Sequence, residues 1–260
     1  MKAVGVQLDI VWEEKAANFA KVRALVEAVD AAPGSLIVLP EMFATGFSMN
    51  VARIRESEAR ETEAFLAALA RGRRAFVIGG VVHADTDGRG RNEALVLDPE
   101  GRRVARYCKM HPFSFAGEDR HYASGEGPVT FAWGEFTVAP FICYDLRFPE
   151  IFRDAVGRGA DCFAVIACWP RPREGHWLTL LQARAIENQA CVIGVNRVGS
   201  DPKAAYSGRS VIIDPRGRVL ADAGSGEGVV AADLDREALA QYRREFPALA
   251  DMRAEYKRRA

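Results

Sequence analysis

Apolar positions in the first half of the chain alternate between the period of a strand and the period of a helix. Residues 2–10 and 35–41 are short apolar runs of the kind that form buried strands. Between them, apolar side chains recur three or four positions apart, as on one face of a helix, at Phe19, Val22, Val26 and Val29. The pattern predicts a strand, a helix and a second strand.

The alternation continues to residue 109. A second helix is predicted around 57–71 and a strand at 75–82. Residues 92–109 contain two β-rich runs separated by the tetrad Asp98-Pro99-Glu100-Gly101, which is typical of a hairpin turn.

The same series then begins again. Strands are predicted at 136–145, 161–169 and 191–199, helices at 149–158 and 176–189, and a hairpin at 208–223. The hairpin segments "LVLDPEGRRV" at 95–104 and "VIIDPRGRVL" at 211–220 share their turn chemistry at the same point of the series. The chain is therefore predicted to consist of two related halves.

Strands that are apolar on both faces must be covered on both faces. Two sheets packed against each other, with helices outside, meet this requirement. We predict a four-layer α/β/β/α sandwich, built from two pseudo-repeated halves and forming one domain over residues 1–260. From about 235 we expect a helix broken by Pro247 and then a basic tail.

The charge balance removes several classes of partner. The 260 residues include 35 Lys and Arg against 35 Asp and Glu, so the chain lacks the basic excess that binds nucleic acid or an anionic membrane. The N-terminal apolar run is too short for a signal peptide, and no window approaches the roughly 18 apolar residues of a membrane span. We expect a cytoplasmic protein with a small-molecule partner, and neither a nucleic-acid nor a membrane partner.

The cysteines favour reduced thiols over a disulfide framework. The five are scattered, mostly in apolar runs, and no pair has CxxC spacing; they are Cys108, Cys143, Cys162, Cys168 and Cys191. The four histidines form no HExxH or similar ligand set. We therefore expect neither a metal nor a cofactor.

Three predicted strand ends carry reactive side chains, Glu41, Lys109 and Cys143. Carboxyl ends of strands are where side chains of an α/β sheet converge on a ligand. Each residue alone has an ordinary explanation, as a solvated carboxylate, a surface lysine or a core cysteine. Together they fit nucleophilic catalysis, because a thiol with a pKa of about 8.5 needs a base or a positive charge nearby at neutral pH. Such a lysine, with a backbone N–H just past the cysteine, would also stabilise an oxyanion.

Three sequence blocks resemble the signature blocks of the nitrilase superfamily of carbon–nitrogen hydrolases. They are "LPEMFATGF" at 39–47, "KMHPFSFAGEDRHYASG" at 109–125 and "ICYDLRFPEIFR" at 142–153. Their order and spacing match as well. The likeness extends through 180–201 and 206–217 and so covers nearly the whole chain.

The resemblance implies an α/β/β/α sandwich that pairs into a homodimer or a higher homo-oligomer. It implies that Glu41 is the general base, Lys109 the electrophilic stabiliser and Cys143 the nucleophile. Glu118 matches a fourth catalytic residue, and the backbone N–H of Tyr144 matches a second oxyanion donor. These roles predict a thioester on Cys143, which water activated by Glu41 and oriented with the help of Glu118 then hydrolyses.

Further segments resemble the bacterial omega-amidases, which act on the terminal amide of 2-oxoglutaramate or 2-oxosuccinamate. They are "KMHPFSFAGEDRHYASGEG" at 109–127, "CWPRPREGHWLTLLQARAIENQ" at 168–189 and "YRREFPALAD" at 242–251. Such a substrate carries a carboxylate away from the reacting amide, and a guanidinium can bind a carboxylate through two parallel hydrogen bonds.

Arginines just beyond predicted strand ends are the candidates for this carboxylate. Of Arg147, Arg171 and Arg173 we favour Arg173, with Arg147 as the second candidate, although each could instead pair within the protein. Trp169 and Phe43 are candidate apolar walls of the site, or else plain core residues.

Other functions stay open on the sequence. The protein could hydrolyse an N-carbamoyl amino acid, or be another aliphatic amidase or nitrilase. From a different class, it could be a non-catalytic binding or redox module with a reactive thiol, although the presence of Glu41, Lys109 and Cys143 together argues against that. His111 is either the partner of a Cys-His pair or, as we expect, a residue that supports the site without acting on substrate.

Overall fold

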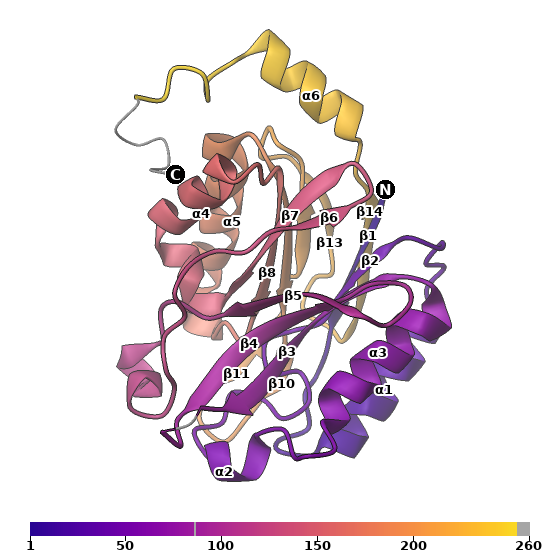
Figure 1. Ribbon diagram of the computed structural model, residues 1–260, viewed down its shortest axis with the longest axis vertical. Helices are drawn as coiled ribbons and strands as arrows, with labels where there is room; N and C mark the ends of the chain where they lie inside the picture. Colours follow the sequence, from indigo (N-terminus) through magenta and orange to yellow (C-terminus); the bar gives the residue numbers. More distant parts are fainter. Residues whose placement is uncertain (86, 254–260) are drawn as a thin grey trace.

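The computed structural model describes residues 1–85 and 87–253, in which strands alternate with helices (Figure 1). The strands are β1 (Lys2–Gln7), β2 (Leu36–Val38), β3 (Phe76–Ala84), β4 (Gly90–Leu97), β5 (Arg103–Cys108), β6 (Phe131–Trp133), β7 (Phe136–Ile142), β8 (Cys162–Ala167), β9 (Cys191–Asn196), β10 (Val198–Ser200), β11 (Ala205–Ser207), β12 (Val211–Ile213), β13 (Val219–Asp222) and β14 (Gly228–Asp233). The helices are α1 (Lys15–Glu27), α2 (Val51–Ile54), α3 (Glu61–Arg73), α4 (Pro149–Gly157), α5 (Glu174–Asn188) and α6 (Arg236–Glu245). Four short 3₁₀ turns are η1 (Ser114–Ala116), η2 (Glu118–Arg120), η3 (Cys143–Arg147) and η4 (Arg171–Arg173).

The strands form two six-stranded sheets that lie between two helical layers. The first sheet has the order β14-β1-β2-β3-β4-β5 and the second β13-β12-β9-β8-β7-β6, while β10 and β11 form a separate pair. Helices α1 and α3 lie on one side of the sheets and α4 and α5 on the other (Figure 1). The predicted α/β/β/α sandwich is thus confirmed.

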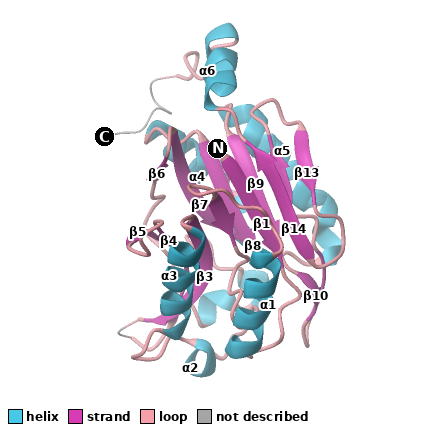
Figure 2. Cartoon of the chain, turned by 90° about the vertical axis from the view of Figure 1, so that its right-hand side faces the viewer, coloured by secondary structure: helices cyan, strands magenta, loops and turns pink. Residues whose placement is uncertain are grey.

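The core between the sheets takes side chains from both. Val38, Ile78 and Val96 of the first sheet belong to the same buried cluster as Phe141 and Ile166 of the second. The sheets approach closely enough that a Cβ added to Gly5 would lie 2.8 Å from Val195 Cγ2. Helix α6 stands beyond one end of the sandwich, as Figures 1 and 2 both show.

The two sheets share one plan, as the sequence repeat predicted. Strands β1, β2 and β3 run parallel, and β4, β5 and β14 join antiparallel. In the second sheet β7, β8 and β9 run parallel, and β12, β13 and β6 join antiparallel. Both parallel stretches cross over through helices, because a parallel connection needs a long link.

The repeated hairpin turns have the same hydrogen bonds. Asp98 Oδ1 accepts the backbone N–H groups of Glu100 and Arg102, and Asp214 Oδ1 accepts those of Arg216 and Arg218. The glycine that ends each turn has a positive φ, 75° at Gly101 and 81° at Gly217, a conformation that glycine adopts without steric cost.

Several predicted boundaries differ from the structure, and the largest shift in a helix start is at the second predicted helix. Helix α3 begins at Glu61 and not at 57. The carboxylate of Glu56 accepts the N–H of Thr62 at 2.9 Å and that of Glu63 at 3.2 Å, so residues before 61 form the connection that satisfies the first turn of the helix.

The C-terminal helix is present where the sequence placed it. Asp235 caps α6 by accepting the N–H of Ala238 at 3.0 Å, and the helix ends before Pro247. The expected basic tail extends past 253 and so lies outside the described residues. Within those residues no helix has the length and apolar character needed to cross a membrane.

Candidate active site

Strand ends from both sheets bring the candidate residues to one end of the sandwich. Cys143 directly follows β7, Lys109 directly follows β5, and Glu41 lies three residues beyond β2. The turn that carries Glu41 packs tightly on β3, where a Cβ added to Gly80 would lie 2.8 Å from Glu41 Cα. Glycine at 80 therefore allows this turn to sit against the sheet.

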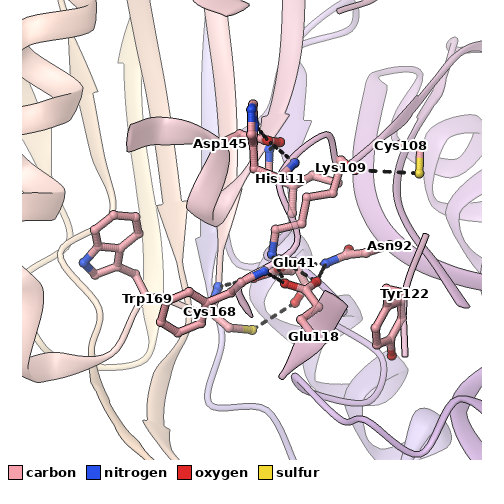
Figure 3. Close-up of polar contacts among 12 residues, drawn as sticks. Glu41, Asn92, Cys108, Lys109, His111, Glu118, Tyr122, Asp145, Cys168 and Trp169 are labelled. Atoms are coloured by element: carbon pink, nitrogen blue, oxygen red, sulfur yellow. Dashed lines mark hydrogen bonds and ion pairs between the residues drawn. The ribbon is translucent and has the colours of Figure 1, made fainter. Parts of the chain in front are cut away.

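The ammonium of Lys109 lies between two buried carboxylates (Figure 3). Its Nζ is 2.9 Å from Glu41 Oε1, 2.8 Å from Glu118 Oε2 and 3.1 Å from Glu118 Oε1. Lys109 is 1% exposed and both glutamates are 0% exposed. Three charges removed from water are tolerated only when they are paired and hydrogen-bonded, and here each is.

Two residues that the sequence did not single out hold these carboxylates. Asn92 Nδ2 donates to Glu41 Oε1 at 2.7 Å and to Glu118 Oε1 at 2.9 Å. The backbone N–H of Cys168 donates to Glu41 Oε2 at 2.8 Å. The only sequence signal for Asn92 is an amide inside the apolar run of β4, and a backbone donor such as that of Cys168 leaves no signal in a sequence.

Burial and charge set the proton affinities of the cluster. Burial raises the pKa of Glu118; the charge of Lys109 opposes this rise and the charge of Glu41 adds to it. Burial alone would lower the pKa of Lys109, but the charges of Glu118 and Glu41 outweigh it and raise the pKa well above its ordinary value. Lys109 therefore stays cationic throughout the neutral range.

Cys143 sits at a sharp turn between β7 and η3. Its φ is 49°, in the left-handed region that costs a non-glycine residue roughly 1–3 kcal/mol and that clusters at functional sites. Burial raises the pKa of the Cys143 thiol well above its ordinary value, with Glu41 adding to the rise and Lys109 opposing it. The resting side chain is thus a thiol, which must lose its proton before it can act as a nucleophile.

A cavity of about 450 Å³ opens beside Cys143. Its lining includes both Cys143 and Cys168, and the rest is aromatic or basic for the most part. The aromatic members are Phe47, Phe113, Phe115, Tyr144, Trp169 and Tyr206, and the basic members are Arg147, Arg171, Arg173 and Lys203. A cavity with two thiols, aromatic walls and four cations against one carboxylate, that of Asp201, suits a small organic anion.

Comparison with known proteins decides the family. The sequence pattern of the carbon–nitrogen hydrolases matches residues 3–244. The chain belongs to the carbon–nitrogen hydrolase family. This confirms the resemblance that the three sequence blocks carried.

Two curated relatives of this carbon–nitrogen hydrolase are similar over almost their full length. Omega-amidase YafV of Yersinia enterocolitica is 40% identical over 255 residues, which cover 96% of each chain. The 2-oxoglutaramate amidase of Bacillus subtilis is 34% identical over 248 residues, covering 95% of each chain. The protein is accordingly an amide-hydrolysing enzyme.

A solved structure supports both the family assignment and the α/β/β/α fold. A CN-hydrolase superfamily protein from Xanthomonas campestris, with an arsenic adduct in its active site, superposes with a TM-score of 0.91. The two sequences are 32% identical, and the superposition covers 98% of this chain and 97% of that one.

A third buried carboxylate, that of Asp145, supports the turn that carries Cys143 in this carbon–nitrogen hydrolase. Asp145 Oδ2 accepts the hydroxyl of Tyr107 at 2.7 Å and the N–H of Ile142 at 3.2 Å. Asp145 Oδ1 lies 3.0 Å from the backbone nitrogen and 2.9 Å from Nδ1 of His111 (Figure 3). His111 is therefore bound to the turn that carries Cys143.

Arg147 and Arg173 line the cavity on aromatic faces. The guanidinium carbon of Arg147 lies 4.8 Å from the ring centre of Trp169, and that of Arg173 lies 5.4 Å from the ring centre of Phe113. Neither arginine forms an ion pair with a carboxylate of the described residues, and the same holds for Arg171. All three charges can therefore meet an anion that enters from solvent.

Two sequence expectations are corrected here. Phe43 does not line the cavity; it is 0% exposed and packs in the core of the first half, 5.9 Å from the ring of Phe65. Cys168, which the sequence analysis left among the scattered cysteines without a role, lies at the cavity wall, and its Sγ is 3.2 Å from the carbonyl oxygen of Glu41. The alternating pattern of a strand could not predict where these two side chains point, because both residues lie beyond the end of a strand.

Trp169 lies at the cavity wall, and Asn196 holds it there. The backbone N–H of Trp169 donates to Asn196 Oδ1 at 2.7 Å, and Asn196 Nδ2 donates back to the carbonyl of Trp169 at 3.1 Å. Trp169 is only 3% exposed, so it serves both as a wall and as a core residue.

Proposed function

We propose that the protein is an omega-amidase that hydrolyses the terminal amide of a small 2-oxo dicarboxylic acid through a thioester on Cys143. The observation that carries the proposal is the hydrogen bonding of Glu41 beside that thiol. Its relatives named omega-amidase and 2-oxoglutaramate amidase support the substrate class.

Glu41 has room for one more proton donor. A carboxylate offers about four acceptor positions, and Lys109, Asn92 and the N–H of Cys168 occupy three of them. Among the described residues the fourth, on Oε2, has no donor. In our proposal it accepts the Cys143 proton as sulfur attacks the amide carbon.

The oxyanion that forms would be held by Lys109 and by the N–H of Tyr144. An ammonium has three N–H bonds, of which one points to Glu41 and one to Glu118 Oε2. The third N–H, which makes the longer contact with Glu118 Oε1, can donate to the oxyanion instead. Tyr144 is one of the first residues of η3, where backbone N–H groups have no acceptor within the turn.

Glu118 would act through Lys109. Its oxygens accept from Lys109, from Asn92 and from the backbone N–H of Phe113, so they are fully engaged. This supports a positioning role for Glu118 over the orientation of water that the resemblance suggested.

The remaining steps use the same groups. Protonated Glu41 gives its proton to the departing ammonia, leaving the acyl group on Cys143 as a thioester. Glu41 then removes a proton from water, which attacks the thioester and releases the acid. Arg173, with Arg147 in the same cavity, would bind the substrate carboxylate and fix the amide over the thiol.

A substrate comparison tests this proposal. We expect ammonia release from 2-oxoglutaramate and 2-oxosuccinamate, and much slower release from N-carbamoyl amino acids and from simple aliphatic amides and nitriles. Faster release from a carbamoyl amino acid, accompanied by carbon dioxide, would assign the protein to the carbamoylase branch.

The intermediate can be tested separately. Acid quenching during turnover should leave the acyl group on the tryptic peptide 121–147, which contains Cys143. The Cys108→Ser variant is the matched control, because it removes the half-buried thiol of β5 and should leave the acyl-enzyme signal intact. Turnover without any acyl group on this peptide would exclude the covalent mechanism.

A further inference from the structure

The cavity is lined by two thiols that end neighbouring parallel strands. Cys143 directly follows β7 and Cys168 directly follows β8, and these strands pair in the register Ile142 to Ile166. A continued ladder would set Cys143 opposite Ala167 and point the Cys143 and Cys168 side chains to opposite faces of the sheet. The ladder ends before Cys143, however, where the left-handed backbone turns the chain, and both thiols line the same cavity.

We propose that Cys143 and Cys168 form a reversible disulfide when a peroxide enters the cavity, so that Cys168 protects the nucleophile from irreversible oxidation. The proposal rests on the proposed function, since it takes Cys143 to be the reactive thiol. It assigns Cys168 a chemical role that amide hydrolysis does not require.

The chemistry is balanced with hydrogen peroxide as the oxidant. Glu41 removes the Cys143 proton, and sulfur attacks one peroxide oxygen; the O–O bond breaks, and the leaving hydroxide takes that proton to form water. The resulting sulfenic acid on Cys143 is then attacked by the Cys168 sulfur, and a second water leaves. Two thiols have lost two electrons in total, and a dithiol reductant returns them.

A turn of the Cys168 side chain toward Cys143 costs one weak hydrogen bond and some repacking, because Cys168 is buried in the core. Its Sγ makes one weak contact, 3.2 Å from the carbonyl oxygen of Glu41 (Figure 3). The hydrogen bond that fixes the Glu41 carboxylate comes from the backbone of Cys168, so a rotation of the side chain does not require that bond to break. Burial raises the pKa of both thiols well above the ordinary value, so both sulfurs lie in a dry environment beside the same cavity.

The other cysteines lie elsewhere. Cys162 and Cys191 are paired residues at the starts of β8 and β9, which are the ends away from Cys168. Cys162 lies six positions before Cys168, which corresponds to about 20 Å along a strand. Cys108 borders a different hollow together with Arg91 and Arg158.

Peptide mapping after treatment with hydrogen peroxide tests the proposal. Without reduction, we expect the tryptic peptide 121–147 to be linked to 159–173, and fragment ions should place the bond at Cys168 and not at Cys162. A dithiol should then remove the link and restore ammonia release. Oxidation of Cys143 to a sulfinic acid in the unaltered protein, or a link to any other cysteine, would overturn the proposal.

Two variants sharpen the result, each measured against its own untreated activity. Cys168→Ser should lose activity to peroxide without recovery in dithiol, because its Cys143 proceeds to the sulfinic acid. Cys108→Ser should form the link and recover as the unaltered protein does. Equal recovery in Cys168→Ser would refute the protective role.

The outcome is separable from the proposed function. The link is read by mass and does not depend on turnover, so its formation in a protein without amidase activity would reject only the function. Turnover that requires Cys143, with no link to Cys168, would reject only this inference.

Discussion

The two halves of the molecule share a sheet plan but supply different chemistry. The first half provides Glu41, Asn92, Lys109 and Glu118, a cluster of buried polar groups that can hold and move a proton. The second half provides Cys143 with its strained turn, the Cys168 amide and the arginines of the cavity. Neither half therefore contains a complete site.

The difference shows how a repeated scaffold can make an asymmetric site. Cys168 directly follows β8, which occupies the same place in the second sheet as β2, the strand before Glu41, does in the first. Equivalent ends thus face each other across the sandwich, and the N–H of one binds the carboxylate of the other. The site depends on both sheets being packed together.

The largest expected effect is the loss of proton transfer in the first half. Glu41→Gln keeps the shape of the side chain but cannot accept the thiol proton, so kcat for ammonia release should fall by about 10²–10⁴-fold. Glu93→Gln is the matched control, since it removes an equally buried carboxylate of β4 outside the cavity and should retain kcat. Equal losses in the two variants would reject Glu41 as the base.

The second prediction concerns the charge balance of the same cluster. Lys109→Met leaves two carboxylates buried without their cation, and should lower the free energy of unfolding in urea by about 3–5 kcal/mol. Adding Glu118→Gln removes one of the uncompensated charges and should restore part of that stability. No gain from the second substitution would mean that the cluster is not held together by charge.

Substrate recognition tests the second half. Arg173→Met should raise KM for an anionic omega-amide by about 10- to 100-fold, the range of a lost charged hydrogen bond, with a smaller change in kcat. Arg171→Met offers a matched control, since that arginine is more exposed on the same 3₁₀ turn. A larger increase in KM from Arg171→Met than from Arg173→Met would place the carboxylate-binding site at Arg171.

The raised pKa of the Cys143 thiol gives a pH dependence of known sign. A thiol whose pKa lies above its ordinary value gains thiolate as pH rises, so alkylation by iodoacetamide should still increase about tenfold per pH unit at pH 8–9, where an ordinary thiol levels off. Peptide mapping of the Cys108→Ser variant follows alkylation at Cys143 with no competing reaction at the half-buried Cys108. A plateau near pH 7 would indicate a preformed thiolate.

The smallest expected effect is at His111, which contacts Asp145 of the second half. His111→Ala removes a contact to Asp145 but no proposed catalytic atom, and should lower kcat by less than about tenfold if its role is to support the Cys143 turn. Cys143 alkylation rates check that the thiol is still accessible. A loss as large as that of Glu41→Gln would favour a Cys-His pair.

The sequence predicted those residues of the candidate site that lie at the ends of strands. Lys109 and Cys143 directly follow strands, and the sequence blocks around them carried the resemblance to the family that matches residues 3–244. Phe43 was misplaced because the turn after Glu41 directs it into the core beside Phe65. Asn92 and the Cys168 amide were missed because their importance comes from contacts with distant residues.

By itself, the sequence determined the order of strands and helices, the repeat of the two halves and the family, because periodicity and local turn chemistry are properties of short segments. Only the tertiary structure decided which groups surround the thiol. Glu41 and Cys168 are 127 residues apart, and Glu41 and Lys109 are 68 apart. Their hydrogen bonds exist because the packing of two sheets removes these groups from water, where each polar group must find a partner within the fold.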